Sequence, residues 1–163
     1  MKRLHFYNIK DEYIKYLYQF DNKVPFNKEC KRPYIGIVLD INENTYFAPM
    51  FSPKKQHMKY KSNVTYVKIE KNLGIIKLNN MIPVNKKDLF YIDFNNIKNE
   101  KYKNLLIQQN SYIQINSDRI RKNADKLYKF VTVDKQDFFL NICCDFKKLE
   151  EKCREYEKKN RSN

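Results

Sequence analysis

The spacing of hydrophobic residues changes near Asn95, and this change divides the chain into two parts. Before Asn95, short apolar and aromatic runs alternate with clusters of Asn, Asp, Glu and Lys, which is the pattern of short strands joined by turns. After Asn95, apolar residues recur at three- and four-residue intervals, which is the spacing of helices. The pattern predicts the α+β class, with most strands ahead of most helices.

The first part predicts a small antiparallel sheet. Strands are expected at residues 4–9, 34–40, 45–50, 64–69, 73–78 and 89–94, with a short edge segment at 81–84. Asn42-Glu43-Asn44 is expected to form the turn between the second and third strands. Gly36 inside the second strand predicts a bulge or the close approach of another backbone. Pro49 and then Pro53 are expected to end the third strand, because proline removes a ladder donor and fixes φ. Many short strands of this kind are typical of a compact, strongly bent antiparallel β-sheet or barrel.

Helices are expected to wrap this sheet. A first helix is predicted at residues 12–20, with Asp11 as its N-cap. Residues 100–129 fit one long helix or two consecutive helices, and Asn116-Ser117-Asp118 is a candidate break. Asp145 is expected to cap a closing helix at residues 146–158, whereas the apolar run at 138–143 fits either a strand or a helix.

Composition limits the number of domains and the class of site. The 163 residues fit one domain, which we expect to span residues 1–163. The chain has 2 Gly, which excludes glycine-rich phosphate loops and dinucleotide-binding fingerprints. Apolar runs stay well short of the roughly 18 residues of a membrane span, and the N-terminus turns polar by Asn8, unlike a signal peptide. We therefore expect a cytoplasmic protein without a membrane partner.

The net charge points to a polyanionic partner. The chain has 33 Lys and Arg against 19 Asp and Glu, a formal net charge of +14 at pH 7, which favours nucleic acid first and an acidic membrane surface second. The chain is also rich in Asn, Ile and Tyr, so AT-rich coding would explain part of the lysine excess. The positive field attracts RNA or DNA whatever its origin. Six cations would line one groove if they share a face, namely Lys59, Lys61, Lys77, Arg119, Arg121 and Lys122.

Metal-centred and cysteine-centred chemistry find little support in the sequence. The 4 cysteines show no CxxC pair and no zinc-ligand spacing, and we expect them to be reduced. His5 and His57 lie far apart, and most carboxylates stand beside lysines, as on solvated helix faces. The sequence therefore predicts no metal site and no cofactor.

The stretch F-S-P-K-K-Q-H at residues 51–57 supplies candidate chemistry. Its proline makes a short rigid turn after a strand, and the turn presents a hydroxyl, two ammonium groups and an imidazole. An ordinary exposed loop has a similar composition, because Ser, Pro and Lys are common in loops. The functional alternative is a site that handles phosphate.

RNA cleavage without a metal ion needs few protein groups. The ribose 2′-OH is the nucleophile, so the protein aligns it, stabilises charge at phosphorus and protonates the leaving 5′-oxygen. Lys54 would stabilise the anion and donate the proton. Ser52 would hydrogen-bond a non-bridging oxygen or relay a proton, and a Tyr, Lys55 or His57 would assist.

A series of short motifs, taken in chain order, carries a family resemblance. The motifs are F-Y at 6–7, Y-I-x-Y-L at 13–17, D-x-K-V-P at 21–25, Y-I-G-I-V-L at 34–39, Y-x-A-P at 46–49, S-P-K-K-x-H at 52–57, G-x-I-x-L-x-x-M-I-P at 74–83, N-S-D-R-I at 116–120 and L-E-E-K at 149–152. This ordered set covers nearly the whole chain. It resembles the ToxN/AbiQ family, the endoribonuclease toxins of type III toxin–antitoxin systems.

The resemblance implies a fold, an activity and a partner. The implied fold is a bent antiparallel sheet like that of the MazF, CcdB and Kid toxins, wrapped by added helices. The implied activity is metal-independent cleavage of single-stranded, adenine-rich RNA, including cellular or phage mRNA, with 2′,3′-cyclic phosphate and 5′-hydroxyl products. The implied inhibitor is an antitoxin RNA whose repeats fold as pseudoknots. The toxin cuts its precursor and binds the product, often in a closed protein–RNA ring, and such systems often act in phage defence.

The resemblance also implies roles for individual residues. The family's active-site Ser and Lys match Ser52 and Lys54, and its helix-one Tyr matches Tyr13, so these three are expected in catalysis. A basic residue before the second strand matches Arg32, and Phe51 stands where some relatives carry Thr, so it would stack or pack instead. The residues expected to bind RNA are Arg32, Phe51, Lys55, His57, Lys59, Lys61, Asn116, Arg119, Arg121 and Lys122.

Two other functions fit the same observations. A basic module could bind RNA tightly without cutting it, with Ser52 as an ordinary loop residue. A toxin directed at DNA gyrase or at the ribosome could share the fold, because fold does not fix function. Cleavage of free RNA distinguishes the endoribonuclease from both alternatives.

Overall fold

The centre of the molecule is a hairpin of two long strands, β2 (Tyr34–Ile41) and β3 (Asn44–Phe51). In the computed structural model, which describes residues 2–162, Asn42 and Glu43 turn the chain with φ values of 49° and 65°. A two-residue turn with positive φ matches the twist of the strands that it joins. Aromatic and aliphatic residues fill most of both strands, which suits a buried pleated surface.

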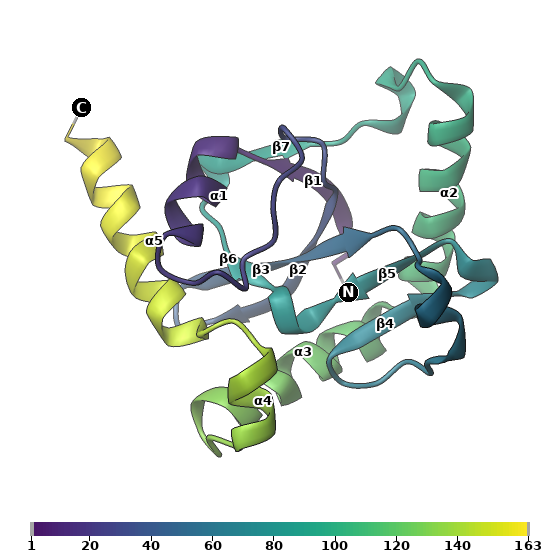
Figure 1. Ribbon diagram of the computed structural model, residues 1–163. Coiled ribbons are helices and arrows are strands. Elements are labelled where there is room, and N and C mark those ends of the chain that lie inside the picture. Colours follow the sequence, from purple (N-terminus) through teal and green to yellow (C-terminus); the bar gives the residue numbers. More distant parts are fainter. Residues whose placement is uncertain (1, 163) are drawn as a thin grey trace.

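Shorter strands extend this hairpin into one antiparallel sheet. They are β1 (His5–Ile9), β4 (Tyr66–Ile69), β5 (Gly74–Lys77), β6 (Ile82–Pro83) and β7 (Leu89–Tyr91). The strand order is β4-β5-β3-β2-β1-β7, and β6 pairs with β3 outside this path. Tyr46 and Phe47 of β3 pair with β6, whereas Met50 and Phe51 pair with β5. Strand β3 is therefore shared by two parts of the sheet (Figure 1).

Helices surround this sheet (Figure 1). The α-helices are α1 (Asp11–Tyr18), α2 (Glu100–Ile115), α3 (Ser117–Thr132), α4 (Asp137–Ile142) and α5 (Phe146–Arg161). Short 3-10 helices are η1 (Lys55–Lys59), η2 (Glu70–Asn72), η3 (Leu78–Asn80), η4 (Lys86–Asp88) and η5 (Phe94–Asn96). Between residues 2 and 162, no helix combines the length and the hydropathy needed to cross a membrane.

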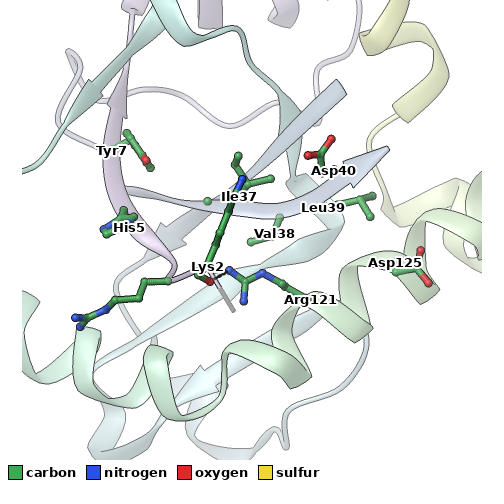
Figure 2. Close-up of a pocket in the computed structure, with 11 residues that line it drawn as sticks. Lys2, His5, Tyr7, Ile37, Val38, Leu39, Asp40, Arg121 and Asp125 are labelled. Atoms are coloured by element: carbon green, nitrogen blue, oxygen red, sulfur yellow. Dashed lines mark hydrogen bonds between the residues drawn. The ribbon is translucent and has the colours of Figure 1, made fainter. Parts of the chain in front are cut away.

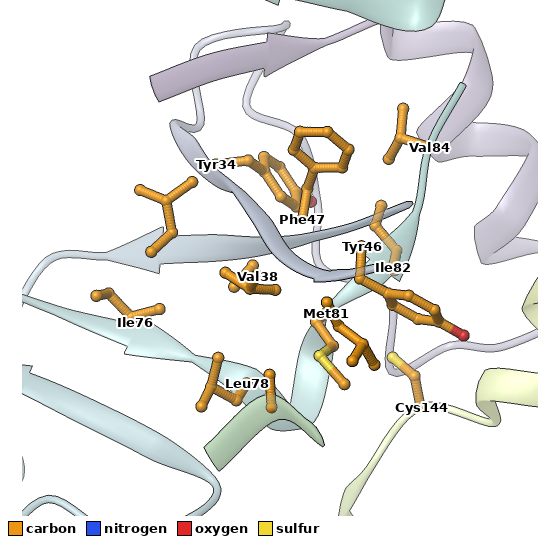
Figure 3. Packing of buried hydrophobic residues seen from close by; sticks show 14 of the residues in the cluster. Tyr34, Val38, Tyr46, Phe47, Ile76, Leu78, Met81, Ile82, Val84 and Cys144 are labelled. Carbon is orange, nitrogen blue, oxygen red and sulfur yellow. The ribbon is translucent and has the colours of Figure 1, made fainter. Parts of the chain in front are cut away.

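The sheet and the helices bury one hydrophobic cluster. Helix α3 packs against β2, and α5 packs against β6 and α1. The buried residues of α3 include Ile120, Ala124, Leu127 and Val131, a spacing that keeps them on one face. Figure 3 shows side chains of β2, β3 and β5 converging with Met81 and others in this cluster.

A buried carboxylate connects three elements of the core. Glu150 on α5 is 3% exposed, and its Oε1 accepts hydrogen bonds from the hydroxyls of Tyr46 on β3 and Tyr128 on α3, both at 2.7 Å. Lys147 Nζ lies 3.3 Å from Glu150 Oε2. Because every buried hydroxyl in this group has a partner, the network fixes how α3 and α5 sit on β3.

Most predictions of local structure are confirmed. The α+β class and the antiparallel sheet with helices around it match the structure. The turn at Asn42 and the helix break at Asn116 lie where the sequence places them. Asp145 caps α5, since its Oδ1 accepts a hydrogen bond from Lys148 N at 3.1 Å. The run at 138–143, which the sequence left open, falls mostly within helix α4.

The irregularity predicted at Gly36 is confirmed. The pairing of β2 with β3 shifts register between Gly36 and Leu39. A Cβ atom at position 36 would lie 2.2 Å from Cδ1 of Phe47, so the aromatic ring occupies the space that a side chain would need. Glycine is therefore required here for close packing across the hairpin.

The prediction that Pro49 ends its strand is wrong. Strand β3 runs through Pro49 to Phe51, and Pro49 lies opposite Tyr34 in the ladder. The next residue, Met50, donates its N–H to Pro33 O at 2.9 Å. The proline therefore removes one donor without ending the pairing, and the strand stops just before Ser52 and its following proline.

The prediction that Asp11 caps the first helix is also wrong. Lys10 holds the N-cap position without a side-chain hydrogen bond, and Asp11 is the first helical residue. There the carboxylate complements the positive end of the helix dipole. It also pairs with Lys15 one turn later, at 3.0 Å.

Candidate active site

The end of β3 holds two cations against one aromatic ring. Phe51 is the last residue of β3, and Cζ of Arg32 lies 4.0 Å from its ring centroid. Nζ of Lys77 lies 4.5 Å from the same centroid. Arg32 precedes β2 and Lys77 ends β5, so the strands on each side of β3 deliver one cation each. Cation–π attraction holds both charges one residue away from Ser52.

Arg32 is fixed by backbone carbonyls. It is 6% exposed, its Nε donates to Phe26 O at 2.7 Å, and its Nη1 donates to Met50 O at 3.1 Å. The ion pairs found within residues 2–162 do not include Arg32. Burial lowers the pKa of its guanidinium from the usual value, yet arginine remains charged in proteins. This charge is therefore available to an anionic ligand.

Lys77 adds a second cation under electrostatic strain. Its partial burial lowers the pKa of the ammonium group, and the positive charges of Lys54 and Arg32 lower it further. An anion placed among these three groups would relieve their mutual repulsion. From the sequence, Lys77 is expected among the cations of a possible groove. In the structure, Lys77 instead lies against the ring of Phe51, next to Ser52.

The turn after β3 carries Ser52 and Lys54 to the surface. Both residues are exposed, and η1 starts at the next residue, Lys55. Lys54 N donates to Nδ1 of His57 at 3.0 Å, and His57 N donates to Lys54 O at 2.8 Å. These reciprocal bonds close the turn, so the Lys54 side chain leaves a fixed backbone.

His57 is oriented as a hydrogen-bond donor. Because its Nδ1 accepts the Lys54 N–H, the neutral ring carries its proton on Nε2. Partial burial lowers the pKa of His57, and the charges of Lys77, Lys54 and Lys68 lower it further. The imidazole is therefore neutral at pH 7, with the Nε2–H free to meet a ligand.

A cavity of about 330 Å³ opens beside Ser52. Phe51 and Ser52 line one side of it, and Tyr102, Leu105 and Gln109 of α2 line another. Its remaining walls come from the turn before β5 and from the basic loop before β2. The cavity thus joins the exposed hydroxyl to an apolar recess that no motif in the sequence marks.

These groups suit the binding of a phosphodiester. Arg32 and Lys77 provide fixed positive charge, and Lys54 provides an exposed ammonium group that can donate a proton. Ser52 and the Nε2–H of His57 provide neutral donors. Donors and charges held in place before the substrate arrives are what stabilises a phosphorane.

The structure does not bring Tyr13 to this turn. Tyr13 is fully buried on α1, and its hydroxyl donates to Pro83 O at 2.5 Å. Pro83 pairs with Tyr46, which precedes Ser52 by six residues, or about 20 Å of extended strand. Burial is the main cause that raises the pKa of Tyr13 well above its usual value.

The other residues expected to bind RNA lie on two surfaces. Lys55, Lys59 and Lys61 are exposed on η1 and the loop after it. The second surface is the start of α3, where Arg119 and Lys122 are exposed and Asn116 joins α2 to α3. The two surfaces meet where Asn123 Nδ2 on α3 lies 3.5 Å from Asn63 O in the loop.

Arg121 faces a different cavity from the one beside Ser52. This second cavity, of about 520 Å³, lies between β1, β2 and α3. Figure 2 shows Arg121 extending from α3 toward it. Its Nη2 donates to Lys2 O, and neither Ser52 nor Lys54 lines this cavity. The structure therefore separates Arg121 from the Ser52 turn.

Acidic, histidine and cysteine side chains are dispersed in the part of the chain that the structure describes. Across residues 2–162, no group of three or more His, Cys, Asp or Glu side chains could hold a metal ion. Cys143, Cys144 and Cys153 are buried and free of disulfides. Burial raises the pKa of the Cys143 thiol to about 12, which suits a packing residue.

Sequence reasoning missed the wall that α2 contributes. Gln109 donates a hydrogen bond to Leu73 O, which lies 36 residues earlier in the chain. The local sequence pattern does not indicate a contact between residues so far apart in the chain. Lys77 was expected in a cationic groove and not at this turn, although a lysine inside the apolar run G-I-I-K-L is a visible signal.

Comparisons with known proteins converge on one family. The family model described as toxin ToxN of type III toxin–antitoxin systems matches residues 5–154. The chain is similar to the endoribonuclease ToxN of Bacillus thuringiensis subsp. kurstaki, with 39% identity over 167 residues that cover 96% of this chain and 86% of that protein. It is 33% identical to the endoribonuclease AbiQ of Lactococcus lactis subsp. lactis over 168 residues, which cover 96% and 91% of the two chains.

Solved structures agree with the sequence comparisons. A structure of AbiQ, a lactococcal anti-phage endoribonuclease of a type III system, matches with a TM-score of 0.87 and 27% identity, covering 96% of this chain and 99% of that chain. A toxin structure from work on selective inhibition by a non-coding RNA pseudoknot matches with a TM-score of 0.86 and 39% identity, with the same coverage of 96% and 99%.

Proposed function

This chain belongs to the ToxN family of type III toxin–antitoxin systems, and we propose that it cleaves single-stranded RNA at the Ser52 turn without a metal ion. It is an RNA-cleaving enzyme, as its curated relatives are. The observation that carries the assignment is the pair of cations on Phe51, one residue from Ser52. Arg32 and Lys77 supply positive charge of the kind that a metal ion supplies in other nucleases.

The proposed reaction is a transesterification within the RNA. The 2′-oxygen attacks the adjacent phosphorus and the bond to the 5′-oxygen breaks, which leaves a 2′,3′-cyclic phosphate and a 5′-hydroxyl. The 2′-OH proton passes to solvent, and Lys54 donates a proton to the leaving 5′-oxygen. Ser52 donates a hydrogen bond to a non-bridging oxygen, while Arg32 and Lys77 bind the phosphate.

The residues around the turn have supporting roles in this proposal. Lys55 and the Nε2–H of His57 stand next to Lys54 and contact the phosphates that flank the cleaved bond. Phe51 holds the two cations, which explains an aromatic residue at the strand end. The burial of Tyr13 and its bond to Pro83 O support a role in the fold, so the proposed steps proceed without it.

The proposal extends to substrate, inhibitor and place of action. The substrates are adenine-rich sites in cellular or phage mRNA, and the inhibitor is a repeat-derived pseudoknot RNA that the toxin processes and binds in a closed ring. Similar toxins support this, since one is inhibited by a non-coding RNA pseudoknot and one belongs to an antiviral system regulated by a processed non-coding RNA. We place the toxin in the cytoplasm, acting as one domain over residues 1–163 in phage defence.

Cleavage in the presence of EDTA tests the proposed mechanism. Antitoxin-free toxin should cut single-stranded RNA in EDTA and leave 2′,3′-cyclic phosphate ends. Lys54→Ala should lower the single-turnover rate by about 10²–10⁴-fold. Lys86→Ala is the matched control, because Lys86 is an exposed lysine that starts another 3-10 helix, η4, and it should leave the rate unchanged.

Each part of the proposal has an outcome that contradicts it. Loss of wild-type cleavage in EDTA would overturn the metal-free mechanism. Undiminished cleavage by Lys54→Ala would remove Lys54 from the reaction. Tight binding of RNA that stays intact under all conditions would favour a binding module over a nuclease.

A further inference from the structure

Gln109 on α2 carries a buried acceptor without a partner. The residue is 7% exposed, and its Nε2 donates to Leu73 O at 2.8 Å. Its Oε1 is buried and has no hydrogen-bond partner among the described residues. Buried polar atoms nearly always have a partner. Because the side chain lines the cavity beside Ser52, a ligand bound there can supply one.

The contacts of Gln109 determine which of its atoms is left over. Leu73 O can only accept, so it selects the amide NH₂ group, and the oxygen must be the remaining atom. Gly74 follows Leu73 with a φ of 153°, and a Cβ there would lie 3.1 Å from Gln109 Nε2 and 3.3 Å from Phe51 O. The absence of a side chain at Gly74 thus lets the amide approach the end of β3.

The cavity has the lining of a site for a nucleobase. Its volume of about 330 Å³ lies in the range of small-molecule pockets. Leu105 and Leu106 contribute apolar surface, and Tyr102 contributes an aromatic ring that can stack on a base. Arg32 lines the same cavity, so a phosphate bound there would bring its attached base into the recess.

We propose that this cavity binds a base next to the cleaved bond, and that Gln109 Oε1 accepts a hydrogen bond from the exocyclic amino group of that base. The inference rests on the function proposed above, because the base enters only when its phosphate lies at Ser52. Adenine and cytosine carry an amino group where guanine and uracil carry an oxygen. A base oxygen at this position would face Oε1, and two acceptors repel each other. The site therefore selects bases with an amino group over bases with an oxygen at this position.

Substrates that differ by one exocyclic group test this with the wild-type protein. Single-stranded RNAs carry adenosine, purine riboside, which lacks the amino group, or inosine, which carries an oxygen, on either side of the cleaved bond. At one of the two positions, purine riboside should slow single-turnover cleavage about tenfold, the value of one hydrogen bond, and inosine should slow it further. If the three nucleotides give the same cleavage rate at both positions, the inference is overturned, whereas the proposed cleavage is not affected.

A pair of matched variants tests the residue itself. Gln109→Met keeps the length of the side chain and removes the acceptor, so it should cleave adenosine and purine riboside substrates at equal rates. Gln114→Met is the control on the same helix, because the Gln114 amide also donates to a backbone carbonyl, Leu4 O at 2.6 Å, and does not line the cavity. It should keep the wild-type ratio.

The ratio separates recognition from a structural role. If Gln109 only supports the fold, Gln109→Met slows every substrate alike and keeps the preference, which would overturn the inference. Wild-type toxin that cuts none of the RNAs would overturn the proposed function, and the inference with it. The two failures are therefore distinguishable.

Discussion

Three cations stand close together at the end of β3 although their charges repel. Burial lowers the pKa of both Lys77 and Arg32, and the positive charges of Lys54 and Arg32 lower the pKa of Lys77 further. The ring of Phe51 and the carbonyl of Met50 offset part of the cost of keeping these groups charged. A phosphate among these groups would remove the repulsion, so at the residue scale the free protein is poised to bind an anion.

The pKa of His57 provides a measurement of this field. In the free protein, partial burial and the charges of Lys77, Lys54 and Lys68 hold it below the usual value of about 6.5. Because the unfolded chain binds the proton more readily, the contribution of the neutral ring to stability is complete above about pH 6.5 and is lost as pH falls through the lowered pKa. Protonation of Nδ1 would also break the hydrogen bond from Lys54 N.

An NMR titration of the His57 ring with and without sulfate tests the field. Without the anion, His57 should titrate below pH 6.5. With sulfate, which stays charged over this range, the midpoint should rise, because a bound anion offsets the three lysines. A midpoint at or above 6.5 in the free protein, or no response to sulfate, would contradict an anion site at the turn.

At the element scale, Glu150 connects α5 to α3 and β3. Glu150→Ala would leave the buried hydroxyls of Tyr46 and Tyr128 without an acceptor. At about 1–3 kcal/mol for each of the two unsatisfied groups, we expect a loss of about 2–6 kcal/mol in the free energy of unfolding. Urea unfolding followed by circular dichroism measures this change.

Two further variants separate the network from a general effect of charge. Glu150→Gln keeps an oxygen for the two tyrosines and should lose less than Glu150→Ala. Glu151→Ala removes the neighbouring exposed carboxylate on the same helix and should change stability by less than about 0.5 kcal/mol. Equal losses in Glu150→Ala and Glu151→Ala would show that the buried hydrogen bonds are not what holds α5 in place.

Elements were predictable from sequence where their causes are local. The turn at Asn42 and the cap at Asp145 depend on neighbouring residues, so their signals are visible in the chain. The end of β3 was misplaced because Met50 and Phe51, which follow Pro49, pair with β5. That pairing is a tertiary property, and it overrides the local preference of proline.

The candidate site divides in the same way. Ser52 and Lys54 are neighbours in the sequence, so their shared turn could be foreseen. Arg32 and Lys77 meet at the ring of Phe51 only because of the order of the strands. Gln109 reaches the site through a hydrogen bond to Leu73, which lies 36 residues away in the sequence. Spacing along the chain carries no information about such contacts, which only the folded sheet creates.

At the scale of the whole molecule, the net charge of +14 raises the question of whether RNA follows a defined path. The loop after η1 meets α3 at Asn123, and Arg119 and Lys122 are exposed at the start of that helix. A strand held at the Ser52 turn could therefore continue across the loop onto α3. The alternative is that the field of the whole protein attracts RNA without a preferred track.

The salt dependence of RNA binding decides between these two cases. Each phosphate neutralised on a single strand contributes about 0.7 to the slope of log K against log salt. If both α3 cations contact phosphates, the double variant Arg119→Gln with Lys122→Gln should reduce the slope by about 1.4. Lys86→Gln with Lys87→Gln removes the same charge from an exposed site away from the turn and should leave the slope unchanged. Equal reductions in both double variants would mean that net charge, and not a path over α3, sets the affinity for RNA.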